Sequence, residues 1–64
     1  MHSNADELLP AAMVFNRYHV SQMTVWRWLR SATLNFPRPL LINRRRYWRL
    51  ADLIAWERSQ EVTT

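Results

Sequence analysis

Cysteine and glycine are both absent from this 64-residue sequence, and each absence excludes a kind of site. Without cysteine the chain can form neither a disulfide bond nor a zinc site with thiolate ligands. Without glycine it has no glycine-rich loop of the kind that cradles phosphate groups. No apolar run approaches the roughly 20 residues that a membrane-spanning helix needs, and no signal segment opens the chain. We therefore expect one small domain in a reducing cytoplasm, with no membrane partner.

Acidic residues are absent from the middle of the chain, where the positive charges gather. The nine positive charges are all arginine, and eight of them lie between Leu8 and Ala51, a span without any Asp or Glu. This central span therefore carries a formal charge of +8, whereas the whole chain carries +4. Exposed surfaces usually mix both signs of charge, so a long span of one sign indicates a polyanionic partner. Double-stranded DNA is the partner we expect.

The segment from Ser21 to Leu34 has the pattern of a helix with two unlike faces. Ser21 is a good N-cap, because its hydroxyl can accept a hydrogen bond from the first turn. At about 100° per residue the apolar side chains gather on one face. The packing residues are Val25, Trp28, Leu29 and Ala32. The other face has no carboxylate and carries Met23, Arg27 and Arg30, with Trp26 at the boundary and Gln22 near the helix start. Arginine reads guanine and glutamine reads adenine, so this face suits the major groove of DNA.

A first helix is expected from Leu8 to Tyr18, with Pro10 in its first position, where a missing N–H costs nothing. Its packing side is predicted to consist of Ala12, Met13, Phe15 and in part Val14, with Asn16 and Arg17 in solvent. Only His19 and Val20 separate this helix from the cap at Ser21. Two helices joined by so short a turn predict a helix-turn-helix, with His19 in a left-handed conformation.

A β-hairpin is expected after the segment Phe36-Pro37-Arg38-Pro39, whose prolines exclude a helix. Leu40-Leu41-Ile42 and Tyr47-Trp48 are its two short apolar strands. The tip has no glycine, and Asn43 is the residue best suited to positive φ. Three successive arginines follow it, and we predict that they contact DNA from a wing: Arg44, Arg45 and Arg46.

The last helix is expected from Leu50 to about Glu61, with Asp52 in its first turn and with Glu57, Arg58 and Glu61 in water. Trp56 and Leu29 should be largely buried, because so small a domain has few other residues to close its core. The predicted fold is therefore α+β, a small winged helix-turn-helix with three helices and a two-stranded hairpin. It spans residues 8–62, after a flexible arm at residues 1–7.

Nothing in the sequence indicates an enzyme. The central span has no paired carboxylates, and so short a chain cannot build a Ser-His-Asp set. We expect no catalytic residue, no metal site, no cofactor and no small-molecule ligand.

The order of these motifs resembles the AlpA-like and excisionase branch of the MerR-type winged helix-turn-helix proteins. Five motifs carry the resemblance, which covers roughly residues 8–59. They are Leu8-Leu9; Ser21, Thr24, Val25, Trp26 and Arg27 opening the second helix; Phe36 to Pro39; the wing ending at Trp48; and the late Trp56. The family often has glycine in the turn and at the wing tip, where this chain has His19 and Asn43-Arg44.

The resemblance implies a small bacterial DNA-binding protein of a prophage or integrative element, located at the nucleoid. Some members are recombination directionality factors, which bind and bend attachment-site DNA so that a separate tyrosine- or serine-type integrase excises the element. The residues that match the family's groove-facing helix, together with its N-cap, are Ser21, Gln22, Met23, Thr24, Trp26, Arg27 and Arg30. Because one helix and one wing cover little DNA, we expect a monomer whose copies bind neighbouring sites side by side.

Two other functions remain open at this stage. The first is transcriptional regulation of mobile-element genes, as in AlpA itself, which would use the same DNA-reading surface. The second is a basic protein-interaction module whose positive face binds an acidic protein. A steep fall of DNA affinity with salt, together with preference for one sequence, would favour DNA binding.

Overall fold

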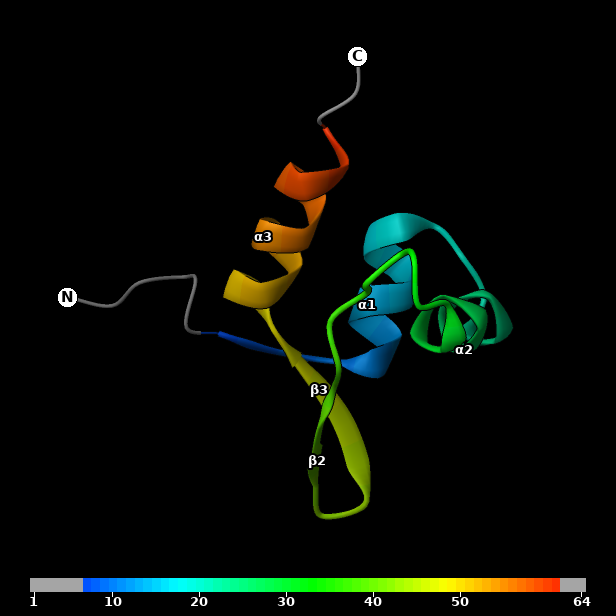
Figure 1. The fold of residues 1–64 in the computed structure, drawn as a ribbon. Helices are drawn as coiled ribbons and strands as arrows, with labels where there is room; N and C mark the ends of the chain where they lie inside the picture. Colours follow the sequence, from blue (N-terminus) through cyan, green and yellow to red (C-terminus); the bar gives the residue numbers. More distant parts are fainter. Residues whose placement is uncertain (1–6, 62–64) are drawn as a thin grey trace, which may run out of the picture.

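The computed structural model describes residues 7–61 of the chain. Its elements follow in the order β1 (Leu8–Pro10), α1 (Ala11–Tyr18), α2 (Gln22–Arg30), β2 (Leu40–Ile42), β3 (Arg45–Arg49) and α3 (Leu50–Gln60) (Figure 1). The result is a small α+β fold with three helices and a three-stranded antiparallel sheet. The expected arm lies outside the described residues except for Glu7, whose carbonyl accepts a hydrogen bond of 2.8 Å from the Leu50 N–H.

The first strand corrects the prediction of a helix from Leu8. The segment Leu8–Pro10 is extended and pairs with β3, so that Leu9 lies opposite Trp48. Pro10 precedes α1 with φ −65° and ψ 157°, and is not its first helical residue. The pairing buries Leu9, and proline is tolerated because β1 is an edge strand. The sheet therefore has three strands in the order β1-β3-β2, in place of the two-stranded hairpin that was expected.

The packing side of α1 also differs from the prediction. Val14 is fully buried, and Ala11, Phe15 and Tyr18 pack against the core around it. These four positions recur at helical spacing, so they form one continuous face once the helix begins at Ala11. The predicted packing residues Ala12 and Met13 are exposed. Because β1 pairs with β3 and leads directly into α1, the position of the sheet determines which face of α1 is buried.

The turn between α1 and α2 confirms two predictions. His19 ends α1 in the left-handed conformation, with φ 55° and ψ 45°. Its N–H and that of Val20 bond back to carbonyls of the last turn, which satisfies groups that a helix end leaves free. Ser21 then caps α2, because its Oγ accepts the Thr24 N–H at 3.2 Å.

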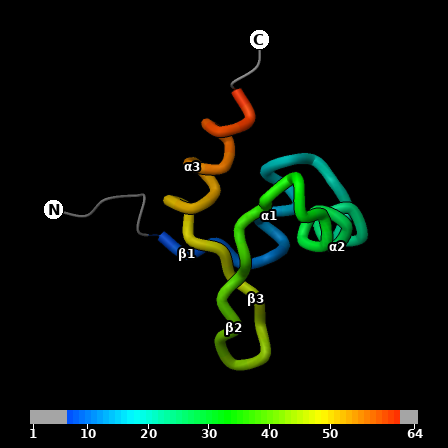
Figure 2. Tube along the Cα trace, in the orientation of Figure 1, coloured from blue at the N-terminus to red at the C-terminus, as the bar shows by residue number. Residues whose placement is uncertain are grey.

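The second helix ends at Arg30, four residues before the predicted end at Leu34. Ser31 has an extended backbone, and its Oγ accepts the Leu34 N–H at 3.3 Å. A serine hydroxyl that bonds a nearby backbone N–H competes with the helix, which explains the early end. The connection that follows runs between α3 and α2 towards β2 (Figure 2).

The β2–β3 hairpin turns through two residues, Asn43 and Arg44, with φ 51° and 69°. Positive φ at both central residues is the requirement of the type I′ turn that suits a two-residue hairpin. The prediction for Asn43 is confirmed. Arg44 adopts the same uncommon region without being glycine or asparagine, which costs about 1 kcal/mol.

The core lies between the sheet and the helices, and its largest fully buried side chain is Trp48. Trp56 and Leu29 were expected to be largely buried, but both are only partly buried at the edge of this core. Trp48 belongs to the central strand and is 1% exposed, whereas Trp56 packs against the rings of Trp28 and Phe36 at the edge of the core. The buried residues are Leu9, Val14, Val25, Phe36, Trp48 and Leu53.

Two tryptophans fasten the connection between α2 and β2. The Trp48 Nε1–H donates to the Pro37 carbonyl at 2.8 Å, and the Trp56 Nε1–H donates to the Leu34 carbonyl at 3.0 Å. Phe36, which lies between these two carbonyls in the chain, is buried. The connection is thus a loop of defined conformation, because a buried ring and two hydrogen bonds hold it.

Candidate nucleic-acid interface

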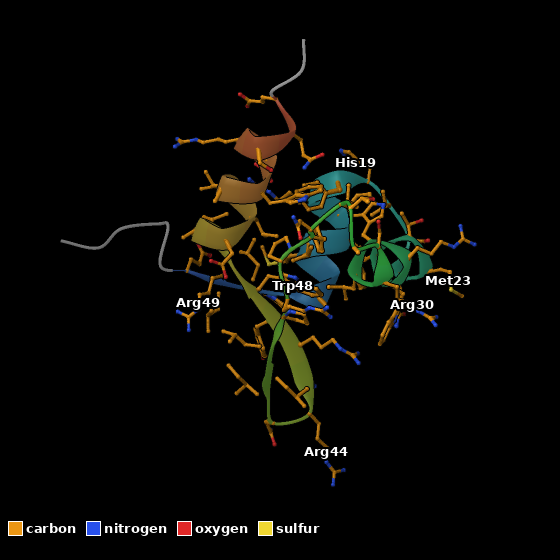
Figure 3. All side chains as sticks on the ribbon, viewed as in Figure 1. His19, Met23, Arg30, Arg44, Trp48 and Arg49 are labelled. Atoms are coloured by element: carbon orange, nitrogen blue, oxygen red, sulfur yellow. The ribbon has the colours of Figure 1, made fainter. Side chains whose placement is uncertain are left out.

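The outward face of α2 presents the exposed side chains that the helical pattern predicted. Met23 is 63% exposed and Trp26 is 39% exposed. Gln22, Arg27 and Arg30 are also exposed. Figure 3 shows Met23 and Arg30 on the side of the molecule opposite Arg49, with Trp48 between them in the interior. The helix therefore separates an inward face, with Val25 buried and Trp28 partly buried, from an outward face that contains no acid.

A hollow of about 460 Å³ lies on this outward face. It is lined by Gln22, Met23, Trp26 and Arg30, and is called the α2 hollow below. The four side chains come from successive turns of one helix, so they follow one line along its surface. Polar groups thus stand at both ends of the hollow, and two apolar side chains lie between them.

Ser21 and Thr24, two of the residues predicted to contact DNA, stabilise the start of α2. Ser21 Oγ lies 3.2 Å from Thr24 Oγ1 and accepts the Thr24 backbone N–H. The two hydroxyls bond each other and close the start of α2. Ser21 and Thr24 therefore set the position of Gln22 and Met23 in the first turn, in addition to any contact of their own.

The three successive arginines of the hairpin do not form one cluster. Arg44 lies at the tip of the turn and extends from the molecule (Figure 3). Arg45 and Arg46 are neighbours in β3, so their side chains leave opposite faces of the sheet. Arg46 turns towards α2, where its guanidinium carbon lies 4.5 Å from the centre of the Trp26 ring. This cation–π contact joins the hairpin to the outward face of α2.

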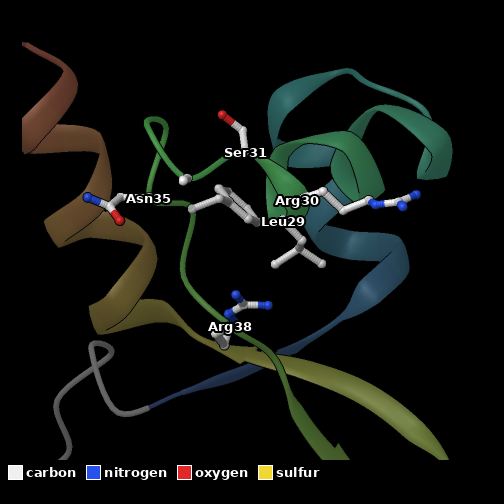
Figure 4. Close-up of a pocket in the computed structure, with 7 residues that line it drawn as sticks. Leu29, Arg30, Ser31, Asn35 and Arg38 are labelled. Atoms are coloured by element: carbon white, nitrogen blue, oxygen red, sulfur yellow. The ribbon is translucent and has the colours of Figure 1, made fainter.

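A second, more polar hollow of about 440 Å³ adjoins the end of α2 (Figure 4). We call it the loop hollow. Its lining residues are Leu29, Arg30, Ser31, Ala32, Asn35, Phe36 and Arg38. Arg38 reaches from the loop towards Leu29, whereas Arg30 extends away along the helix (Figure 4). Because Arg30 lines both hollows, they form one continuous surface.

Arg38 is a candidate site residue that the sequence reading left without a role. The available signal was its place between Pro37 and Pro39, two residues that restrict the backbone on either side. The hydrogen bond from Trp48 to Pro37 adds a further restraint. The loop thus presents Arg38 from a backbone with little freedom.

The arginines of this surface differ from Arg17 in their partners. Arg17 was expected in solvent, but its Nε and Nη2 donate to the two carboxylate oxygens of Glu57 at 2.7 and 2.9 Å. Tyr18 donates its hydroxyl to the same carboxylate at 2.6 Å. Arg17 is exposed, as predicted, whereas Glu57, which was likewise expected to face water, is partly buried. The ion pair between them was not predicted. Within residues 7–61, no other arginine forms an ion pair.

The contacts among Arg17, Tyr18 and Glu57 also shift the pKa of each of these three groups. The two hydrogen bonds from Arg17 hold the pKa of Glu57 below its ordinary value, and the same contact raises the pKa of Arg17. Burial raises the pKa of Tyr18, and its hydrogen bond to Glu57 adds to this effect. These three residues join α1 to α3, and no arginine of the outward face of α2 forms an ion pair with a described residue.

The face of the sheet away from the core forms a third surface, which sequence reading missed. Register places its residues opposite one another across the three strands, and we call it the outer sheet face. It consists of Leu8, Pro10, Leu40, Ile42, Tyr47, Arg45 and Arg49. Five of these side chains are apolar or aromatic, and the described part of the chain covers them only in part. Sequence reasoning missed this surface because Leu8–Pro10 taken alone resembles a helix start, and the strand forms only by pairing with β3.

In the described range, no group of three or more His, Cys, Asp or Glu residues could hold a metal ion. None of the helices between residues 7 and 61 has the length and apolar composition needed to cross a bilayer. The chain matches no protein-family model, no curated protein and no solved structure.

Proposed function

We propose that this chain is a sequence-specific DNA-binding accessory protein with a winged helix-turn-helix fold. In this proposal α2 is the recognition helix and the β2–β3 hairpin is the wing. The protein binds and bends attachment-site DNA and so promotes excision of a prophage or integrative element by a separate tyrosine- or serine-type integrase. It holds no cofactor and performs no catalysis itself.

The observation that carries the proposal is the contact between Arg46 and Trp26. It brings Arg46 of the hairpin to the surface that carries Arg27 and Arg30 of α2, and none of these three arginines forms an ion pair with a described residue. Guanidinium groups without carboxylate partners are available for phosphate oxygens and for base edges. A helix of about 10–12 Å diameter fits the major groove, and a basic hairpin beside it reaches the adjacent backbone.

The order of elements supports the same proposal. A capped helix follows α1 after a turn with left-handed His19, and an arginine-tipped hairpin comes before the last helix. This order is the one expected from the resemblance to the AlpA-like and excisionase proteins. The resemblance supplies the role in excision, since the surface by itself indicates only DNA.

Phosphate contacts are assigned to the edges of this surface. Arg44 at the hairpin tip is placed for a phosphate or for the minor groove. The loop hollow carries Arg30 and Arg38 around polar groups of Ser31 and Asn35, a setting suited to one backbone phosphate. Contacts of this kind fix the register of α2 in the groove without reading sequence.

Neighbouring copies and the integrase are assigned to surfaces that the DNA leaves free. The outer sheet face combines five apolar or aromatic side chains with Arg49, a composition found at protein interfaces, while Arg45 at the hairpin end is kept for DNA as part of the wing. We propose a monomer without DNA, whose copies meet through small head-to-tail contacts on adjacent sites. Such contacts do not close into a ring, so a row of copies can follow the groove and curve the duplex.

Selection of bound duplexes from a random library, followed by footprinting on attachment-region DNA, tests the proposal. We expect a recovered consensus and a footprint that extends cooperatively as protein is added. Excision by the integrase should then require the protein, whereas an activator of transcription would act without the integrase. Equal binding to all duplexes would contradict sequence-specific reading. Binding to an acidic protein without binding to DNA would support the protein-interaction module instead.

A further inference from the structure

The α2 hollow contains an apolar surface that contact with phosphates alone does not explain. Met23 and Trp26 are 63% and 39% exposed, yet they lie between Gln22 and Arg30 on a face that otherwise carries polar groups. Large apolar side chains exposed together usually mark a binding surface. The question is which apolar group a helix in the major groove would meet.

The walls of the hollow have a defined arrangement. Arg46 covers one side of the Trp26 ring at 4.5 Å, which restricts the rotation of the indole. Met23 has no such restraint, and its unbranched side chain adapts to the shape of a neighbouring group. Gln22 lies one turn before Trp26 and presents an amide with both donor and acceptor groups. The hollow thus offers a fixed ring, an adaptable thioether and an amide side by side.

Among the base edges of the major groove, only thymine presents an apolar group, its C5-methyl. Adenine, its pairing partner, presents the N6 donor and N7 acceptor that a glutamine amide binds with two hydrogen bonds. We propose that the α2 hollow reads an A·T pair, with Gln22 bonding adenine while Met23 and Trp26 pack on the thymine methyl. This inference rests on the proposed DNA-binding function and adds base specificity to it.

The spacing along α2 sets the position of the next base that it reads. Arg30 follows Gln22 by eight residues, which is about 12 Å at a rise of about 1.5 Å per residue. At about 3.4 Å per base pair this distance covers three to four pairs. The preferred site should therefore contain an A·T pair with a guanine about three pairs away, within reach of Arg30.

Replacement of single thymines by deoxyuridine tests the proposal, because it removes the methyl and leaves base pairing unchanged. A duplex selected from a random library is prepared with one such replacement at a time, and binding of the full chain is measured by fluorescence anisotropy. We expect affinity to fall about fourfold at one thymine or at two adjacent ones, as for loss of one buried methyl-sized group. Other thymines should show no effect.

Variants of two methionines then locate the effect. Met23→Ala should bind the thymine and deoxyuridine duplexes equally, both more weakly than the unchanged protein binds the thymine duplex. Met13→Ala removes a methionine of similar exposure, 53%, from α1, and should keep the full discrimination. Because both side chains are exposed, neither variant should lose its fold, which circular dichroism verifies.

Three results would contradict the proposal, each at a different step. If the protein binds its selected duplex specifically but no deoxyuridine changes its affinity, the thymine contact is wrong while the proposed function stands. If Met23→Ala leaves the discrimination between thymine and deoxyuridine intact, Met23 does not contact the methyl and the proposed reading by the α2 hollow is wrong. If the protein shows no preference for any duplex, the proposed function itself fails, and this inference fails with it.

Discussion

The two faces of α2 each carry a tryptophan, and the surroundings of the two rings differ. Trp28 on the inward face lies with its ring centre 5.3 to 5.7 Å from those of Phe36, Trp56 and Tyr18. Trp26 on the outward face is 39% exposed, and Arg46 stacks on it. The first ring stabilises the fold by packing in an aromatic cluster, whereas the second shapes a surface. One helix thus has a packing face and an exposed face, set by the direction in which its side chains point.

The arginine side chains show a similar contrast between a residue paired within the fold and residues without an ion pair. Arg17 at the junction of α1 and α3 is held by Glu57 in two hydrogen bonds, so it acts within the fold. Arg27 and Arg30 have no ion pair with any described residue. An identical side chain is therefore structural in one region and available to a partner in the other. The difference lies in where the acids are placed, since all of them fall outside the central span.

The largest effect should come from Trp28→Ala, which is compared with Trp26→Ala on the opposite face of α2. Trp28→Ala should lower the free energy of unfolding by about 3 kcal/mol, because it opens a cavity in the aromatic cluster. Trp26→Ala should lower it by less than about 1 kcal/mol, which is the size of an exposed cation–π contact. Thermal or urea unfolding followed by tryptophan fluorescence measures both. Equal losses in the two variants would erase the distinction between the faces.

Loss of Arg27 should weaken binding to the selected duplex by about 1–3 kcal/mol and binding to random duplex by less, because the side chain is assigned to base reading. The matched control is Arg58→Ala in α3, which removes the same charge far along the chain from this face. Anisotropy titrations on both duplexes give the comparison. If Arg27→Ala loses the same affinity on both duplexes, Arg27 does not read bases.

A smaller effect is expected from Arg38→Ala in the loop hollow. If Arg38 binds one phosphate, its loss should weaken selected and random duplexes alike. The slope of log affinity against log salt should become shallower by about 0.9 units. Arg44→Ala at the hairpin tip should behave in the same way. An unchanged salt slope in Arg38→Ala would show that the loop hollow holds no phosphate.

The smallest predicted effect concerns pH and the Arg17–Glu57 pair. The pKa of Glu57 is lower in the folded protein than in the unfolded chain, where it is about 4.3. The ion pair therefore adds its full stability above about pH 4.3, and this stability is lost as the pH falls through the lowered pKa. Since both side chains are about one-third exposed, at 34% and 31%, we expect less than about 1 kcal/mol. Urea unfolding from pH 7 to pH 3 should show a smaller acid loss in Glu57→Gln than in the unchanged protein. Glu61→Gln is the control, and an identical acid loss in all three proteins would remove the role of the pair.

Features set by local chemistry could be predicted from the sequence. The cap at Ser21, the left-handed His19 and the turn at Asn43 each follow from conformational preferences of one residue and its neighbours. The outward side chains of α2 follow from helical spacing alone. Together, the cap and the helical spacing predict the direction in which Gln22 and the arginines of α2 point.

Features that join distant parts of the chain could not be predicted. The strand at Leu8–Pro10 exists because β3 is there to pair with it, and the three residues alone resemble a helix start. Glu57 meets Arg17 across 40 residues of sequence, and Arg46 meets Trp26 only after the hairpin has folded against α2. Neither contact leaves a periodic signal, because each depends on how separate elements pack.

The central claim is that the outward face of α2 and the hairpin bind DNA and read its sequence. The most direct measurement is the affinity of the full chain for its selected duplex and for random duplex between about 50 and 200 mM salt. We predict that log affinity falls linearly with log salt on both duplexes and that the selected duplex is bound about a thousandfold more tightly. Equal affinities for the two duplexes, or affinities that salt does not change, would contradict the account.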